Sequence, residues 1–257
     1  MNVLLIDIGN TRIKWARFDG RNLGRLRAAV HLGWGAGDYA RRVIGRGRPP
    51  ERILVASVAG ERVNGRVALA ARSAGAPAPE IVTSQRRRGG VTVGYIEPWR
   101  LGVDRFVAAI GAHHLAKGRA VVVVGVGTAM TLDLLDGKGR HLGGAIVPAP
   151  TLMVETLLKN TNGIRRRAQG GAGGGKSLFG KSTRAGLLQG SRYAAAALID
   201  RAVGEARALA GGRKPLVILT GGGAPSVEPL VRSRHMRVPD LVLRGLAALC
   251  LETTPRG

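Results

Sequence analysis

Cysteine is almost absent from this chain of 257 residues. Cys250 is the single example, so neither an intramolecular disulfide nor a zinc site built from cysteines can form. The chain also lacks an apolar stretch of about 18 residues, the length that a membrane-spanning helix needs. Its N-terminal apolar run stops at Asp7, with no basic segment before it and no small-residue cleavage site after it. These absences predict a soluble, cytoplasmic protein that does not associate with membranes.

Acidic and aromatic residues are scarce as well. The chain has 16 acidic against 40 basic residues, a net charge of +24, and only 4% aromatic residues. Strong basicity is typical of nucleic-acid-binding proteins, but single-stranded nucleic acid also needs aromatic stacking platforms. The basic residues are spread along the chain, with dense runs only at 86–88 and 165–167. A compositional bias explains this charge as well, and nucleic acid is therefore not the expected partner.

A strand–turn–strand pattern occurs twice in the sequence. In the first copy an apolar run at 3–6 is followed by Asp-Ile-Gly-Asn-Thr at 7–11 and then by an alternating segment. In the second copy a run at 120–124 is followed by Gly-Val-Gly-Thr-Ala at 125–129 and a further strand pattern. The copies lie 118 residues apart (125 minus 7), which is close to half the chain. The repeat predicts two similar α/β lobes.

The remaining periodicities fit these two lobes, which we place at residues 1–118 and 119–257. In the first lobe we expect helices at 38–44, 62–73 and 104–118, and strands at 53–58 and 80–83. In the second lobe we expect a helix at 186–210, a strand at 216–219, and helices near Val227 and Leu241.

The glycine turns of the repeat have the chemistry of phosphate-binding loops. Glycine lets the backbone approach a ligand, successive N–H groups can cradle phosphate oxygens, and Asn10, Thr11 and Thr128 add side-chain donors. Asp7 is placed to hold Mg²⁺ directly or through water, and Lys14 to reach the same phosphates. Two ordinary hairpins would look the same, but the paired copies favour a nucleotide held between the lobes.

A second glycine-rich segment is a poorer candidate. Residues 170–177 match the G-x-x-x-x-G-K-[ST] pattern letter for letter. That loop needs a buried strand before it and a helix after it, whereas here an arginine-rich segment precedes it and Gly180 follows closely. We expect residues 165–175 to form a flexible loop and not a phosphate cradle.

Asp104 is the candidate general base. The segment Gly102-Val103-Asp104-Arg105 stands at a predicted helix start, where the helix dipole favours an ionised carboxylate. Such a carboxylate can accept the proton of a hydroxyl that attacks a phosphate, and Arg105 can neutralise a neighbouring anion. A simple helix N-cap is the alternative role for Asp104. His113 and His114 lack metal-ligand spacing to another histidine or cysteine, and Tyr95 fits either the core or a substrate contact.

Taken together, these residues resemble the type III pantothenate kinases, in the acetate and sugar kinase/Hsp70/actin superfamily. The resemblance covers nearly the whole chain, and its separate pieces are short but keep their order and spacing. The matching segments are 7–11 with Lys14, 95–98, 102–105, 127–133, 143–148, 182–183 and 220–222.

The resemblance implies two ribonuclease H-like lobes with a nucleotide cleft between them, as in actin-like ATPases. It implies ATP-dependent phosphorylation of pantothenate to 4'-phosphopantothenate, the first step of coenzyme A biosynthesis, by a homodimer that uses Mg²⁺ and a monovalent cation (K⁺ or NH₄⁺). Asp104 matches the catalytic base. The implied ATP-binding residues are Asp7, Ile8, Gly9, Asn10, Thr11, Arg12, Ile13, Lys14 and Thr128. The implied pantothenate-binding residues are Tyr95, Gly102, Val103, Asp104, Arg105 and Thr183.

The chain departs from the family pattern at two positions. Many members carry an aspartate three residues before the threonine of the second turn, where it helps to bind the monovalent cation; Gly125 stands there instead. The Pro-Gly that follows the paired glycines is here Pro148-Ala149. A second function therefore remains open: a catalytically degenerate member that acts as a nucleic-acid-binding or regulatory accessory factor.

Overall fold

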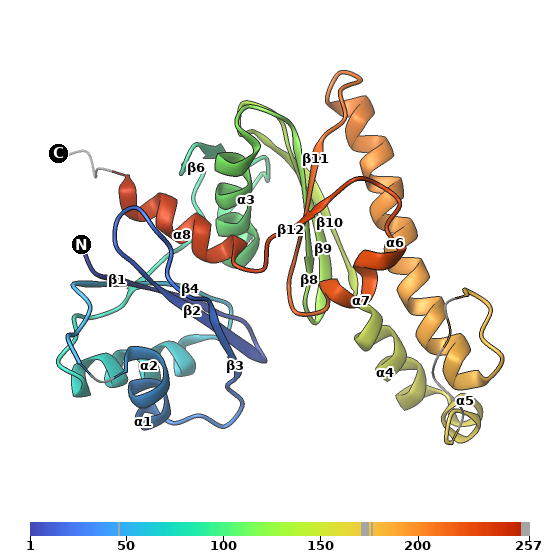
Figure 1. Ribbon diagram of the computed structural model, residues 1–257, viewed down its shortest axis with the longest axis horizontal. Helices are drawn as coiled ribbons and strands as arrows, with labels where there is room; N and C mark the ends of the chain where they lie inside the picture. The colour runs from blue at the N-terminus through green and yellow to red at the C-terminus, as the bar shows by residue number, and fades with distance from the viewer. Residues whose placement is uncertain (46, 171–174, 176, 253–257) are drawn as a thin grey trace. The chain divides into compact units, whose positions relative to one another are not determined.

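The computed structural model describes residues 1–45, 47–170, 175 and 177–252, which form two compact units, each built on its own five-stranded sheet (Figure 1). The first unit contains Met1–Lys117, the short segment Lys138–His141 and the segment that begins at Asp240. The second contains Gly118–Gly137 and Leu142–Pro239. Each unit mixes helices and strands, as the sequence repeat predicts.

The sheet of the first unit has the order β3-β2-β1-β4-β5. Its strands are β1 (Val3–Ile8), β2 (Arg12–Phe18), β3 (Arg27–Val30), β4 (Arg52–Ser57) and β5 (Glu80–Ile81). Strands β1, β2 and β3 pair antiparallel, whereas β4 pairs parallel to β1 and β5 parallel to β4. A hairpin thus opens the unit, and parallel strands reached through crossover connections complete it.

The two faces of this sheet carry different side chains. The register pairs Ile6 with Trp15 and Leu4 with Arg17, so these side chains share one face. The same face packs on α1 (Ala36–Tyr39), the π-helix η1 (Ala40–Ile44) and α2 (Glu61–Ser73), which form one hydrophobic core with it. Asp7 and Lys14, also a register pair, lie on the opposite face. Helices α3 (Val103–Ala116) and α8 (Leu241–Leu251) lie on that other side of the sheet in Figure 1.

Helix α8 belongs to the first unit because two glycines let it cross α3 closely. A Cβ atom on Gly245 would lie 2.0 Å from the carbonyl oxygen of Val107, and one on Gly111 would lie 2.5 Å from that of Leu241. We expected the helix near Leu241 in the second lobe, and the structure corrects this placement. The apolar periodicity of a helix predicts that it packs, but not on which sheet.

We predict that Gly245→Ala strongly destabilises the first unit. The added methyl group has a backbone carbonyl in its way, and overpacking of this kind costs about 1–3 kcal/mol. Gly204→Ala is the matched control, because Gly204 is a helical glycine with open space where its Cβ would be. Alanine should stabilise that helix by roughly 0.5–1 kcal/mol. Urea unfolding of both variants measures the difference, and equal shifts would contradict the close α3–α8 crossing.

The sheet of the second unit repeats the pattern of the first, with the order β10-β9-β8-β11-β12. Its strands are β8 (Val121–Val126), β9 (Ala129–Leu135), β10 (His141–Pro148), β11 (Leu216–Thr220) and β12 (Met236–Arg237). Strands β8 and β9 pair antiparallel and β11 pairs parallel to β8. Strands β1 and β8 begin at Val3 and Val121, which keeps the spacing of 118 residues. The predicted repeat is therefore present in the strands themselves.

The long helix α6 (Thr183–Leu209) covers one face of the second sheet (Figure 1). Its Ala195 and Ile199 share a core with Val122, Val124 and Leu132. The unit also contains α4 (Pro150–Asn160), α5 (Asn162–Arg167), α7 (Ala224–Val227) and the 3-10 helix η3 (Glu228–Leu230). The first unit further contains β6 (Arg87–Arg88), β7 (Val91–Thr92) and the 3-10 helix η2 (Pro98–Arg100).

The expected helices and strands are found with small shifts of their ends, whereas β3, β10, α4 and the π-helical turn were not expected. The expectation of a flexible loop at 165–175 is wrong for its first three residues, which lie in helix α5. Helix α5 follows α4 after a single residue, Thr161, whose backbone N–H and side-chain hydroxyl both donate to the carbonyl oxygen of Leu157. Residues 171–174 and 176, which complete the glycine-rich segment, lie outside the described residues.

Candidate active site

The first glycine turn joins β1 to β2. The amide of Gly9 donates to the carbonyl oxygen of Arg12 at 2.9 Å and closes the turn. Asn10, Thr11 and Arg12 are exposed, whereas Ile8 and Ile13 are buried beneath the turn and pair across the hairpin. The turn therefore presents exposed polar groups on a rigid apolar base, which is the arrangement that an anion cradle requires.

His31 holds this turn in place, a role that the sequence did not reveal. Its backbone N–H donates to the carbonyl oxygen of Thr11 at 3.1 Å, and its Nε2 lies 2.7 Å from the carbonyl oxygen of Gly9. Its Nδ1 lies 2.8 Å from the hydroxyl of Tyr39. A carbonyl oxygen can only accept, so Nε2 carries the hydrogen that is donated to Gly9, and the Tyr39 hydroxyl donates to Nδ1. Burial raises the pKa of Tyr39, in keeping with a protonated phenol at this position.

Asp7 is the last polar residue of β1 before the turn, and it is electrostatically unusual. Burial raises the pKa of its carboxyl from the ordinary value of 3.8 to about 6, while the Lys14 ammonium lowers it and the Asp104 carboxylate raises it. Asp7 therefore lies within electrostatic reach of the candidate base. Two carboxylates and an ammonium in one region of one unit are a set of groups suited to Mg²⁺ and phosphate.

Asp104 lies in the first turn of α3, as predicted. The N-cap of this helix is Gly102, whose carbonyl oxygen accepts from the Phe106 amide at 2.9 Å. The alternative role of Asp104 as the N-cap is therefore wrong. Its Oδ1 accepts from the Arg105 amide at 2.8 Å. A Cβ on Gly102 would lie 2.9 Å from this oxygen, so the glycine leaves room for the carboxylate.

Arg105 and Tyr95 form a pair beside the candidate base. Arg105 is 8% exposed, and its Nη1 donates to the Tyr95 hydroxyl at 3.0 Å. The guanidinium also lies 5.7 Å from the centre of the Tyr95 ring. On the same tyrosine, the centre of the His141 ring lies 5.6 Å from the centre of the Tyr95 ring, and the two ring planes are tilted against each other. Tyr95 is therefore half-buried with its hydroxyl engaged, and it helps to fix the direction of a buried cation.

The second glycine turn and Thr183 belong to the second unit. The Gly127 amide donates to the carbonyl oxygen of Ala129 at 2.9 Å, and Thr128 is exposed. Gly221, with φ of +93°, packs so closely that a Cβ would lie 2.2 Å from the Val126 carbonyl oxygen. Thr183 begins α6, after the N-cap Ser182.

The structure therefore groups the predicted site residues by unit. Those in the first unit are Asp7, Ile8, Gly9, Asn10, Thr11, Arg12, Ile13, Lys14, Tyr95, Gly102, Val103, Asp104 and Arg105; those in the second are Thr128 and Thr183. Among the described residues no group of three or more acidic, histidine or cysteine side chains is arranged to hold a metal ion. His113 is half-buried and His114 is exposed.

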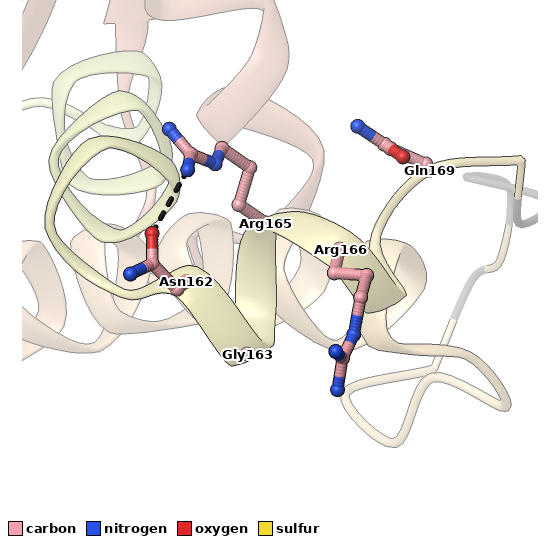
Figure 2. Close-up of a pocket in the computed structure, with 5 residues that line it drawn as sticks. All are labelled: Asn162, Gly163, Arg165, Arg166 and Gln169. Atoms are coloured by element: carbon pink, nitrogen blue, oxygen red, sulfur yellow. Dashed lines mark hydrogen bonds between the residues drawn. The ribbon is translucent and has the colours of Figure 1, made fainter.

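The arginine run at 165–167 does not converge on one site. Arg165 folds back to donate to Asn162 Oδ1 at 2.8 Å, and Figure 2 shows the side chains of Arg165 and Arg166 pointing in different directions. They line an open cavity of about 380 Å³ with Gly163 and Gln169. Within the described ranges, none of the helices combines the length and apolarity needed to cross a membrane.

The family model and the curated relatives that match this chain carry the same family description. Residues 3–205 match the family model described as type III pantothenate kinase. A type III pantothenate kinase of Nitrosococcus oceani is 34% identical over 256 residues, which cover 98% of this chain and 95% of the relative. One of Paracidovorax citrulli is 37% identical over 262 residues, which cover 98% of this chain and 99% of the relative.

Solved structures show the same fold at low sequence identity. A ROK family glucokinase from Streptomyces griseus, solved with glucose and AMPPNP, has a TM-score of 0.52 at 14% identity. The alignment covers 98% of this chain and 99% of that one. A chain of the PilM–PilN type IV pilus biogenesis complex has a TM-score of 0.57 at 12% identity, with the same coverage. The actin-like α/β fold expected from the sequence is confirmed, and the chain belongs to the type III pantothenate kinase family.

Proposed function

We propose that this protein transfers the γ-phosphate of ATP to the terminal hydroxyl of pantothenate and forms 4'-phosphopantothenate, the entry step of coenzyme A biosynthesis. The observation that carries the proposal is the grouping of Asp7, Asp104, Arg105 and Tyr95 in one unit of a chain from this family. Phosphoryl transfer needs a positioned acceptor, a base and stabilisation of phosphate charge, and these residues supply each element.

ATP binding is assigned to the two glycine turns. In the first, the amides and side chains of residues 9–12 and the ammonium of Lys14 face the phosphates, with Ile8 and Ile13 as the apolar base. Thr128 supplies a hydroxyl donor from the second turn. Asp7 would hold Mg²⁺ directly or through water, because its carboxylate, at the end of β1 beside the turn, is the kind of oxygen ligand that Mg²⁺ prefers. When bound, Mg²⁺ neutralises charge on the phosphate oxygens.

Asp104 accepts the proton of the pantothenate hydroxyl during attack on the phosphate. Its carboxylate stands in the first turn of α3, where the helix dipole favours the ionised form. Arg105, held by Tyr95, presents a fixed positive charge to the pantothenate carboxylate. Val103 and Gly102 shape the same end of the helix, and Thr183 adds a hydroxyl from α6.

The direct test is ADP formation with ATP, Mg²⁺ and pantothenate. We expect turnover that requires all three and yields one 4'-phosphopantothenate for each ADP. Turnover that is independent of pantothenate, or none under any condition, would overturn the proposal. An absence of turnover would favour the alternative function, a catalytically degenerate member that binds nucleic acid. Such a protein should bind DNA at low salt and lose this binding steeply at high salt, which a salt titration of DNA binding measures. A decayed site would lose more than one carboxylate, whereas Asp7 and Asp104 are both present.

Replacing His31 by phenylalanine should raise the KM for ATP with a smaller effect on kcat. The substitution keeps an aromatic ring but removes the donor to the Gly9 carbonyl oxygen, so the phosphate turn loosens. Loss of one such bond costs about 1–2 kcal/mol, which corresponds to a rise of roughly 5- to 30-fold. His114→Phe, at an exposed position in the same unit, is the control and should leave KM unchanged. Initial rates at varied ATP distinguish the two, and an unchanged KM in His31→Phe would refute the role of His31.

The monovalent cation is the least supported of the expected cofactors. Gly125 brings no carboxylate, and a Cβ there would lie 2.9 Å from Thr131 Oγ1, its register partner on β9. Main-chain carbonyl oxygens are the ligands that remain at this turn for K⁺ or NH₄⁺. Comparison of rates in potassium, ammonium and sodium salts decides whether a monovalent site operates in this chain.

A homodimer is supported by an apolar groove in the second unit. Met153 and Leu157 of α4, with Leu187 and Ala194 of α6, line a cavity of about 560 Å³ whose walls are mostly apolar. An apolar surface of this kind between two helices favours contact with another protein surface. Sedimentation should show a dimer for the native chain and a monomer for Leu157→Glu.

We also place the reaction in the cytoplasm, where ATP and pantothenate are available.

A further inference from the structure

A second cavity lies in the first unit, on the sheet face opposite to Asp7. It has a volume of about 410 Å³ and lies between strands β2 and β3 and the end of the π-helix η1. Arg17 and Leu4 are register partners, and side chains alternate between the faces of a strand. Arg17 therefore points away from the face that carries Asp7 and Lys14. The proposed kinase site does not use this cavity.

Four arginines line the cavity, and three of them have no acidic partner among the described residues. Arg41 is paired with Asp38 at 2.9 Å. Over the described ranges no carboxylate forms an ion pair with Arg17, Arg25 or Arg27. Arg17 is held by neutral groups instead: its Nη1 donates to Asn2 Oδ1 at 3.1 Å and its Nη2 to the Ile44 carbonyl oxygen at 2.8 Å. Burial, and then the positive charge of Arg27, lower the pKa of Arg17. Like charges gathered without a counter-ion favour the binding of an anion.

The π-helical turn shapes one wall of this cavity. The Gly45 amide donates to the Ala40 carbonyl oxygen at 2.9 Å, which is the i to i+5 bond of a π-helix, and Gly45 leaves the turn with φ of +81°. Ile44 is the last residue of this helix, so its carbonyl oxygen has no donor within the helix and accepts from Arg17. π-turns are rare and occur frequently at functional sites. Here the end of the turn holds the Arg17 guanidinium together with Asn2.

The floor of the cavity is apolar. Leu4, Trp15, Val43 and Ile44 line it, and all four belong to the hydrophobic core of the unit. Leu4, Val43 and Ile44 are at most 4% exposed, so Trp15, at 8%, offers the most open apolar surface of the four. A ligand that combines phosphate oxygens with an apolar or aromatic part would cover both the guanidinium groups and the floor.

We propose that this cavity binds a phosphorylated organic molecule, with its phosphate held by Arg17, Arg25 and Arg27 and its apolar part against Trp15. Guanidinium groups recognise phosphate through paired, charge-assisted hydrogen bonds, so three of them define a phosphate subsite. The site is separate from the phosphate turn at Gly9 and goes beyond the proposed kinase activity.

The test uses the whole chain and two small probes, phenyl phosphate and inorganic phosphate, in calorimetric titrations at low salt. The pocket variant is Arg25→Gln with Arg27→Gln, which leaves the hydrogen bonds of Arg17 intact. The control is Arg165→Gln with Arg166→Gln, exposed arginines that remove the same charge from the second unit. Wild-type protein should bind phenyl phosphate several-fold more tightly than inorganic phosphate, because the ring covers the apolar floor.

In the pocket variant, the Kd for phenyl phosphate should rise by about tenfold or more, with little change in the control variant. ADP formation from ATP and pantothenate should match the wild type in both variants, which shows that they are folded and that the kinase site is separate. The proposal is overturned if wild-type protein binds neither probe, if both variants weaken binding equally, or if inorganic phosphate binds as tightly as phenyl phosphate. An inactive wild-type enzyme would count against the kinase proposal only, since the titrations do not depend on turnover.

Discussion

Asp104→Asn should abolish most pantothenate-dependent ADP formation while the protein remains folded. Asparagine keeps the shape of the side chain and can still accept from the Arg105 amide, as the carboxylate does at 2.8 Å. It cannot take a proton from the attacking hydroxyl. General base catalysis contributes about 10²- to 10⁴-fold, so kcat should fall by that factor. The KM for ATP should change little, because the phosphate turn is untouched.

Asp240→Asn is the matched control for this substitution. Asp240 is also a carboxylate at a helix start in the first unit, as the N-cap of α8, but it pairs with Arg244 at 3.0 Å. Its replacement should leave kcat within about twofold of wild type, since a surface ion pair contributes little. Full activity in Asp104→Asn, or an equal loss in Asp240→Asn, would remove Asp104 from the role of base.

The repeated sheet was predictable from sequence because its signal is local. Alternation of apolar residues around Ile13 and Trp15, a glycine turn, and a second copy 118 residues later are all read along one short stretch. The position of the candidate base was predictable for the same reason, since Gly102 to Arg105 stand together at a helix start.

The contacts that hold the candidate site depend on residues far apart in sequence. His31 reaches Gly9 only because β3 pairs with β2, and β3 carries no strong strand pattern. Tyr95 meets Arg105 through a turn whose path no periodicity fixes. Likewise, nothing local to Gly245 indicates that a carbonyl oxygen of α3 would lie where its Cβ would be. Close approaches of this kind are set by tertiary packing, which a single sequence does not encode in its periodicity.

Asp7→Asn should change stability and activity in opposite directions. In the metal-free protein, burial raises the pKa of Asp7 to about 6 from the ordinary 3.8. Between these values the folded protein binds more protons than the unfolded chain, so stability falls as pH rises from about 4 to 6 and stays lower above pH 6. Asparagine carries no charge and escapes this penalty. At pH 8 with EDTA the variant should gain stability on the order of 3 kcal/mol over wild type.

The same substitution removes the proposed Mg²⁺ ligand, so kinase activity should fall by about 10²-fold or more at saturating pantothenate. Urea unfolding at pH 4.5 and pH 8 measures the stability, and ADP formation at varied Mg²⁺ measures the activity. At pH 4.5 the gain should shrink, because wild-type Asp7 is then mostly protonated. A variant that is less stable than wild type at pH 8 would show that Asp7 is held ionised without cost. A variant that keeps its activity would show that this carboxylate does not bind the metal. We expect the variant to be more stable and less active than wild type. This combination is typical of a carboxylate whose burial lowers the stability of the fold but serves the reaction.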